Sequence, residues 1–227
     1  MLKFLYDDKF IVVCVKPVGV LSETFNREKN MPELIKRQTG AYKIDVIHRL
    51  DRNVGGVMVY SKNSKATLKL AKMMASHSFE KEYLAVVEGE ISGSGSMEDY
   101  LVKDKKNCKV YVADKNKKDA KYARLDYTVL CQKNGLSLVK IKLYTGRTHQ
   151  IRVQLSSRGF YILGDTKYGN QNTKDNGKTP IALFSYRLSF LHPLSNKTIN
   201  CVDLPPTNSA FSPFKKELAN LLKEILD

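Results

Sequence analysis

The segment His48-Arg49-Leu50-Asp51-Arg52 carries the residues of this sequence that are best suited to chemistry. It places one carboxylate between two guanidinium groups, on a turn directly before the apolar run 57–60. Nearby cations favour the ionised form of a carboxyl group, and an ionised carboxylate can attack an electrophilic carbon. An aspartate in a turn can also bond only to its own backbone. The segment alone leaves both interpretations open.

A second group of polar side chains lies in the segment Gly146–Arg152. Gly146 interrupts a strand-like run, and the free backbone N–H groups of a helix start form a site for anions. Arg147, His149 and Gln150 surround that site. His149 and Arg152 are three residues apart and so share one helix face. Since a histidine at a helix start can also be purely structural, the pattern predicts an anion site without identifying the ligand.

Tyr83 is the third candidate, within the run Phe79–Gly89, which we interpret as a strand ending in a glycine turn. A phenol buried near a carboxylate can act as an acid or a base. An ordinary strand aromatic has the same sequence pattern, so Tyr83 is a candidate only in combination with the other segments.

The charge of the chain indicates a polyanionic partner. The formal net charge is +15 and the pI is near 9.6. Residues 101–124 hold nine Lys or Arg against three Asp, and residues 140–187 hold nine against two. Clustered positive charge binds nucleic acid because each phosphate contact releases counterions. We therefore expect RNA or DNA as the partner, although a basic surface without a partner remains an alternative.

Other classes of protein are disfavoured by composition. No apolar run approaches the roughly 20 residues that cross a bilayer, and the N-terminus does not resemble a secretory signal. The four cysteines are scattered at 14, 108, 131 and 201, without the spacing of a metal site or a disulfide framework. We expect reduced thiols in a cytoplasmic protein that contacts no membrane and binds no metal.

The hydrophobic patterns predict strands and helices that alternate irregularly. Strands are expected at 10–15, 57–61, 83–87, 125–130, 136–144 and 181–190. Asn30 is expected to cap a short helix that ends at Gly40, and Asn63 or Ser64 to start a longer one. Because no regular βαβ repeat is present, the pattern favours an α+β fold with a mixed, largely antiparallel sheet and flanking helices.

Two more helices are expected in the second half of the chain. Thr148 is a plausible N-cap for a helix from Gln150 to Arg158, closed by Gly159. The last helix opens at Ser212 and Pro213. Its apolar stripe is expected to pack into the core; the stripe consists of Leu218, Leu221, Leu222, Ile225 and Leu226. No linker divides the sequence, so we expect one domain over residues 1–227.

Taken together, the chemically promising segments resemble the RluA-type pseudouridine synthase family. The family's HRLD motif corresponds to His48–Asp51, its Lys-x-Tyr-x-Ala-x-Val-x-Gly strand to Lys81–Gly89, and its Gly-Arg-x-His-Gln-Ile-Arg motif to Gly146–Arg152. A Gly-Asp-x-x-Tyr-Gly turn follows at Gly164–Gly169, and Lys16–Gly19 is similar to the opening turn of the family. Any one motif is weak, but the ordered set covers nearly the whole chain.

The sequence departs from the family pattern at several positions. Val54 and Gly55 replace the usual Thr and Ser, and Gln154 stands where His is common. Phe160-Tyr161 replaces a His-Pro pair, and Phe184-Ser185 replaces His-Ala. These positions put substrate contacts in doubt, not the catalytic groups.

The resemblance implies an enzyme that isomerises uridine to pseudouridine in structured ribosomal or transfer RNA, on a catalytic fold with a central basic cleft. Asp51 would be the nucleophile, Tyr83 would stack near the base and act as general base on the sugar, and Arg152 would pair with Asp51. The implied substrate-binding residues are Arg49, Arg52, Arg147, His149 and Gln150. The reaction needs no cofactor or metal, and nothing in the sequence indicates an obligate dimer, so we expect a monomer. The module that many relatives carry in front of this domain is not expected.

Two alternatives of other classes remain. A non-catalytic RNA-binding protein would keep the basic surface without needing Asp51. A phosphodiesterase would use His48 and His149 as an acid–base pair and would cleave RNA. Two loops, Lys103–Lys121 with its Tyr111 and Tyr122 neighbours and Asn170–Lys178, are expected to select the target.

Overall fold

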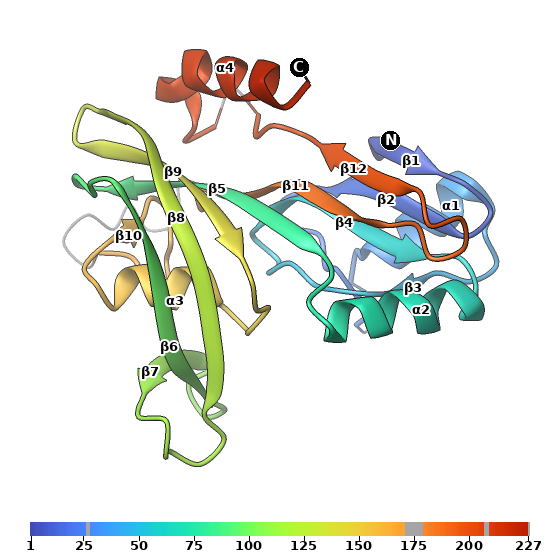
Figure 1. The fold of residues 1–227 in the computed structure, drawn as a ribbon, viewed down its shortest axis with the longest axis horizontal. Helices are drawn as coiled ribbons and strands as arrows, with labels where there is room; N and C mark the ends of the chain where they lie inside the picture. The colour runs from blue at the N-terminus through green and yellow to red at the C-terminus, as the bar shows by residue number, and fades with distance from the viewer. Residues whose placement is uncertain (26–27, 171–178, 207–208, 227) are drawn as a thin grey trace. The chain divides into compact units, whose positions relative to one another are not determined.

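The computed structural model describes residues 1–25, 28–170, 179–206 and 209–226. The chain divides into two compact units. The first combines Met1–Lys81 with Phe184–Pro205, and the second combines Glu82–Leu183 with Pro206–Asp227. Figure 1 labels the helices and strands of both units.

The first unit is built on a sheet of short strands, of which β2 and β4 are the most completely buried. Its members are β1 (Phe4–Asp7), β2 (Ile11–Lys16), β3 (Asp45–Val46), β4 (Gly55–Ser61), β11 (Leu183–Leu191) and β12 (Thr198–Val202). They lie in the order β1-β2-β4-β11, with β3 on β4 and β12 on β11. All these pairs are antiparallel except β4 with β11, which is parallel. Every residue of β4 is buried, so the strand that follows the Asp51 turn lies in the core.

Both helices of the first unit begin at the caps that the sequence predicted. The side chain of Asn30 accepts a hydrogen bond from Glu33 N at the start of α1 (Met31–Thr39). Asn63 does the same for Ala66 N at the start of α2 (Ser64–Ala75). Gly40 ends α1 in the left-handed conformation that glycine tolerates best.

The second unit contains an antiparallel sheet of longer strands. Its members are β5 (Glu80–Glu88), whose first two residues belong to the first unit, β6 (Ser94–Asp104), β7 (Lys109–Ala113), β8 (Lys121–Lys133), β9 (Leu136–Leu143) and β10 (Tyr161–Ile162). Their order is β5-β9-β8-β6-β7, and β10 pairs with β5. The two long strands β6 and β8 lie side by side (Figure 1). The lysine-rich segment 103–121 is thus the end of β6, all of β7 and the start of β8.

Three helical segments complete the second unit: α3 (Gln150–Ser156), the 3-10 turn η1 (Ser212–Phe214) and α4 (Lys215–Leu226). Val153 of α3 packs against Leu101, Val110 and Ala123 of the sheet. In α4, Leu218 and Leu221 are buried, which confirms the predicted apolar stripe at these two positions.

The predicted cap of α3 is wrong. His149, not Thr148, occupies the N-cap position, in a left-handed conformation (φ 54°) and without a side-chain capping bond. The helix also ends at Ser156, two residues before the predicted end at Arg158. The physical reason lies in tertiary contacts of Gln150, described below, which compete with local capping.

The predicted fold class is confirmed: helices and a mixed, mostly antiparallel arrangement of strands make up the chain. All six predicted strand runs are strands, with bounds displaced by up to four residues. Within the described ranges, every helix is too short or too polar to cross a bilayer. Of the loop predicted at Asn170–Lys178, residues 171–178 lie outside the described residues.

Candidate functional site

The turn that carries Asp51 is held by backbone and side-chain hydrogen bonds on both sides. Val54 N donates to Asp51 O (3.0 Å), which closes the turn. Ser22 Oγ donates to Leu50 O (2.7 Å) and accepts from Leu50 N (3.0 Å). Gly19 N donates to Arg52 O (2.8 Å). The backbone on either side of Asp51 is therefore fixed by the segment 19–22.

The two arginines beside Asp51 form ion pairs with glutamates. Arg49 Nη1 lies 2.5 Å from Glu23 Oε1, and Arg52 Nη1 lies 2.8 Å from Glu28 Oε2. Both arginine side chains are more than half exposed, so each pair is solvated and contributes little to stability. The sequence pattern did not indicate these glutamate partners. A direct role for Arg49 and Arg52 in substrate binding stays a prediction.

Lys16, at the end of β2, is a buried cation next to this turn. Its side chain is 0% exposed, and Nζ donates to Pro17 O (3.1 Å), Val20 O (2.7 Å) and Arg52 O (3.0 Å). Burial lowers the pKa of Lys16 to about 8; the negative charge of Asp51 opposes this shift and the positive charge of Arg52 adds to it. The sequence pattern places Lys16 in a turn motif and predicts no role for it.

Two departures from the family pattern fit each other in the structure. A Cβ atom at Gly55 would lie 3.2 Å from Phe184 Cε2 and 3.3 Å from Lys16 O. The position therefore accommodates a side chain poorly while phenylalanine occupies position 184.

The neighbouring Gly56 is required by the close approach of β11. Its φ is 127°, and a Cβ atom there would lie 2.2 Å from Ser185 O.

His48 has the environment of a structural histidine. Its Nε2 accepts a hydrogen bond from Val59 N (3.2 Å). Loss of solvation, with a smaller contribution from the charge of Lys81, lowers its pKa to about 3. A neutral ring whose nitrogen is occupied by a backbone donor is poorly suited to general acid–base work near pH 7. This argues against the phosphodiesterase alternative.

In the second unit, Tyr83 lies on β5 opposite Ile141 of β9 and is 6% exposed. The strand assignment predicted for Phe79–Gly89 is confirmed for Glu80–Glu88. This burial is compatible with a ring that stacks on a bound base and equally with a ring that only packs in the core. The catalytic role of Tyr83 therefore stays a prediction.

Arg152, on α3, forms a buried bidentate ion pair with Asp165. Arg152 Nε lies 2.8 Å from Asp165 Oδ2, and Arg152 Nη2 lies 2.8 Å from Asp165 Oδ1. Lys167 N and Tyr168 N also donate to Asp165 Oδ1. Burial by itself would raise the pKa of Asp165, but the bonds and charge of Arg152, with the two N–H groups, hold it below its usual value.

Sequence reasoning missed Asp165 as a partner. The Gly-Asp-x-x-Tyr-Gly turn is visible in the sequence, but nothing in its local pattern shows which cation pairs with its carboxylate. The predicted pairing of Arg152 with Asp51 stays a prediction.

His149 is tied to the same turn through Tyr168. His149 Nδ1 and Tyr168 Oη are 2.8 Å apart, and the two rings meet edge to face. Val110 N of β7 donates to Tyr168 Oη (2.8 Å), so the tyrosine links the histidine to the strand in the lysine-rich segment. The Arg152 guanidinium lies 5.1 Å from the centre of the Tyr168 ring.

Gln150 is buried, and its amide is used within the protein. Its Oε1 accepts from Thr145 Oγ1 (2.7 Å) and Arg147 N (3.1 Å). Its Nε2 donates to Arg124 O (3.1 Å) and Gln154 Oε1 (3.0 Å). With 3% exposure, Gln150 is better suited to holding the segment 145–147 against the sheet than to the predicted direct contact with substrate.

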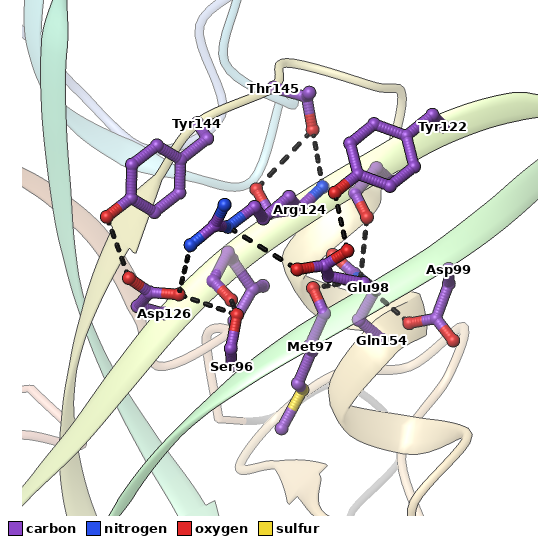
Figure 2. Close-up of polar contacts among 12 residues, drawn as sticks. Ser96, Met97, Glu98, Asp99, Tyr122, Arg124, Asp126, Tyr144, Thr145 and Gln154 are labelled. Atoms are coloured by element: carbon purple, nitrogen blue, oxygen red, sulfur yellow. Dashed lines mark hydrogen bonds and ion pairs between the residues drawn. The ribbon is translucent and has the colours of Figure 1, made fainter.

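Gln154 extends this chain of amides across to β6. Its Nε2 donates to Asp99 Oδ2 (2.7 Å) and Met97 O (3.1 Å), contacts that Figure 2 shows. Arg158 Nη1 and Nη2 pair with the same Asp99 carboxylate at 2.9 Å and 3.1 Å. Gln154, which replaces the family's usual histidine, is thus fully buried and connects α3 to the sheet.

The remaining predicted residue, Arg147, is exposed and donates from Nε to Tyr122 O of β8 (2.8 Å). Nearby, Arg124 lies between Glu98 and Asp126, at 3.7 Å and 3.8 Å (Figure 2). These pairs neutralise part of the positive charge on β8.

Asp51 and Lys16 belong to the first unit, whereas Tyr83, Arg147, His149, Gln150 and Arg152 belong to the second. Among the described residues, no group of His, Cys, Asp or Glu could hold a metal ion. The first unit thus offers a carboxylate on a turn whose backbone is fixed, and the second offers a preorganised set of cationic and aromatic side chains.

A protein-family model described as RNA pseudouridylate synthase matches residues 10–157. An uncharacterized RNA pseudouridine synthase of Mycoplasma pneumoniae is 31% identical over 201 residues, which cover 86% of this chain and 64% of that relative. The ribosomal large subunit pseudouridine synthase D of Zymomonas mobilis is 27% identical over 216 residues, with coverages of 88% and 68%. The chain therefore spans about two thirds of the length of these relatives.

Among solved structures, human RNA pseudouridylate synthase domain containing 1 is similar with a TM-score of 0.78, over 91% of this chain and 84% of that one. The sequence identity is 20%, so this likeness concerns the fold.

Proposed function

Because this chain belongs to the RluA-type RNA pseudouridylate synthase family, we propose that it isomerises uridine to pseudouridine within structured RNA. The observation that carries the proposal is the turn of the HRLD motif, whose backbone is fixed on both sides of Asp51. A carboxylate that must meet one carbon atom of a bound nucleotide requires such fixed placement.

In the proposed reaction, the bond between ribose C1′ and uracil N1 breaks, and a new bond forms between C1′ and uracil C5. Asp51 assists the detachment of uracil, and the proton of C5 is replaced by one on N1. The atoms balance, and no electrons are gained or lost. The target sugar carbon is buried in a stacked helix, so the nucleotide has to be everted, at a cost of a few kcal/mol.

The other residues are assigned supporting roles. Tyr83 would stack near the base and act on the sugar. Arg152 would orient the Asp51 carboxylate, and Asp165 would hold Arg152 in place, since a bidentate pair restricts both position and plane. Arg49, Arg147 and His149 would contact phosphates, with Arg52 beside them.

Replacement of the nucleophile tests the activity. Asp51→Asn should abolish release of tritium from RNA labelled at uracil C5, whereas Glu224→Gln, at an exposed position of α4, should leave the release unchanged. Unchanged product formation in Asp51→Asn would contradict the assignment. RNA binding without any turnover by the wild type would favour the non-catalytic binder, and shortened strands on a denaturing gel would favour the phosphodiesterase.

The target RNA is a separate proposal. Since one relative is called a ribosomal large subunit pseudouridine synthase, we place ribosomal RNA first and transfer RNA second. Mapping pseudouridines in total RNA from cells with and without the gene tests this choice. If deletion of the gene removes a pseudouridine from transfer RNA and none from ribosomal RNA, transfer RNA is the target instead.

We further propose a cytoplasmic protein that acts as a monomer and carries out this redox-neutral reaction without a cofactor. Light scattering with and without RNA measures the number of chains. Activity that is lost on dialysis and restored by a small molecule would contradict the proposal that the reaction needs no cofactor.

A further inference from the structure

Tyr168 joins a predicted RNA-binding side chain to the sheet of the second unit. Its Oη lies 2.8 Å from His149 Nδ1, at the start of α3, and accepts a hydrogen bond from Val110 N of β7 (2.8 Å). Its ring packs against the apolar cluster that β6, β7, β8 and α3 form. One hydroxyl group therefore connects the imidazole of His149 to a strand of the lysine-rich segment.

The backbone of Tyr168 is itself held in place. Tyr168 N donates to Asp165 Oδ1 (3.0 Å), and the Asp165 carboxylate also pairs with Arg152 of α3. Gly169 N donates to Asp165 O (2.8 Å), and a Cβ atom at Gly169 would lie 2.1 Å from that oxygen. Because this turn is tightly closed and bound to α3, the phenol has a defined position beside the helix.

His149 has a backbone conformation that residues other than glycine rarely adopt. Its φ of 54° lies in the left-handed region, and its side chain makes no capping bond although it occupies the N-cap position of α3. Strained residues of this kind cluster at functional sites, because the surrounding structure has to offset the strain. The imidazole is directed to Tyr168 and not to the first N–H groups of the helix.

The bonds of the Tyr168 hydroxyl indicate which ring nitrogen of a neutral His149 carries the proton. Val110 N can only donate, so Tyr168 Oη is the acceptor in that bond. The proton of the hydroxyl is then available for His149 Nδ1, and a ring nitrogen that accepts has no proton of its own. In this tautomer, the N–H donor of the ring is at Nε2.

We propose that Tyr168 is a positioning residue for His149: it holds the imidazole as the Nε2–H tautomer, so that His149 offers a hydrogen-bond donor to a phosphate oxygen of the RNA. Phosphate oxygens of the RNA backbone accept hydrogen bonds, so a neutral histidine that contacts one needs a proton on the nitrogen used for the contact. The inference rests on the proposed function, because it takes RNA as the ligand of His149.

The tautomer can be measured in the free protein, without RNA. The sequence has four histidines, so labelling their ring nitrogens for NMR gives few signals, and a His149→Gln variant identifies those of His149. We expect proton–nitrogen correlation spectra at pH 8 to show His149 as the Nε2–H tautomer. The signals of the Nδ1–H tautomer or of a charged ring would overturn the proposal, whatever the kinetics.

The effect on RNA is tested with Tyr168→Phe, which keeps the ring and removes only the hydroxyl. We expect both tautomers of His149 to be populated and the KM for RNA to rise about fivefold, as for one lost hydrogen bond, with kcat within about twofold of the wild type. Tyr42→Phe, at a position that is 98% exposed, should match the wild type. An unchanged KM in folded Tyr168→Phe protein would overturn the proposal.

A double variant separates the effect on His149 from the effect on β7, because Tyr168→Phe also removes an acceptor from Val110 N. If Tyr168 acts through His149, adding Tyr168→Phe to His149→Ala should change KM by less than about twofold. A further rise of about fivefold would overturn the proposal and show that the hydroxyl only supports the strand.

Two other outcomes are distinguished by the tautomer of the wild type. If Tyr168→Phe does not fold, that measurement alone decides, since it needs no variant at position 168. Wild-type protein that is inactive on every RNA would refute the proposed function and the phosphate contact with it. The Nδ1–H tautomer in an active wild type would refute only the role of Tyr168.

Discussion

The turn of Asp51 and the segment from Arg147 to Tyr168 are held in place by different means. In the turn, the buried side chains of Lys16 and Ser22 bond backbone groups on either side of Asp51. In the segment, side chains mainly bond one another, as in the pairs Arg152 with Asp165 and His149 with Tyr168. The first arrangement fixes a backbone and the second fixes side-chain planes.

The largest effect is expected from breaking the buried ion pair. Asp165→Asn should lower the free energy of unfolding by about 3–5 kcal/mol, because it removes the negative charge of the bidentate pair from the poorly exposed Arg152 guanidinium. Urea denaturation at pH 7 measures the loss, with Glu224→Gln on α4 as an exposed control. The double variant Asp165→Leu/Arg152→Met should lose less than the single one. A single variant as stable as the wild type would show that this pair does not hold the segment.

Acid should weaken the two regions at different pH values. The pKa of His48 is lowered from 6.5 to about 3, so the unfolded chain binds a proton between these values and the folded chain does not. The stability of this region is therefore full above pH 6.5 and falls as the pH drops toward 3, by a few kcal/mol at most.

The lowered pKa of Asp165 affects stability only at a lower pH than that of His48 does. Its contribution is present above the unfolded value near 3.8 and is lost as the pH falls further. Residue-resolved hydrogen exchange at pH 7, 5 and 4 should show that β4 loses protection before α3. His48→Gln should remove the difference, and simultaneous loss in the wild type would contradict it.

A medium effect is expected at Ser22. Ser22→Ala leaves both backbone groups of buried Leu50 without their partner, which should cost about 1–3 kcal/mol. The proposed activity should fall in kcat more than in KM, because the turn is displaced and the RNA surface is not. Ser78→Ala, at an exposed position, is the control. A change in KM alone would mean that this bond does not position Asp51.

The smallest effect is expected at the exposed pair of Arg52 and Glu28. Glu28→Gln should change the free energy of unfolding by less than about 1 kcal/mol, and the change should shrink further in high salt. Thermal denaturation at two ionic strengths measures both. A larger, salt-independent loss would show that this surface pair, and not Lys16, holds the turn.

Local features of the fold could be predicted from the sequence. Asn30 and Asn63 cap helices because a cap needs only an oxygen three residues before its donor. The strand β9 followed from alternation alone. Thr148 failed as a cap because Gln150, two residues on, is fixed by Thr145, Arg124 and Gln154, and these tertiary bonds determine where α3 begins.

The sequence by itself determined six of the strands, the caps at Asn30 and Asn63, the excess of positive charge and the family, because these depend on neighbours in the chain or on the order of motifs. Only the tertiary structure decided the partners: Glu23 and Glu28 for the two arginines, Asp165 for Arg152, and three carbonyl groups for Lys16. The charge of a side chain follows from its residue type. The group that meets this charge depends on distances that are set only when remote segments pack.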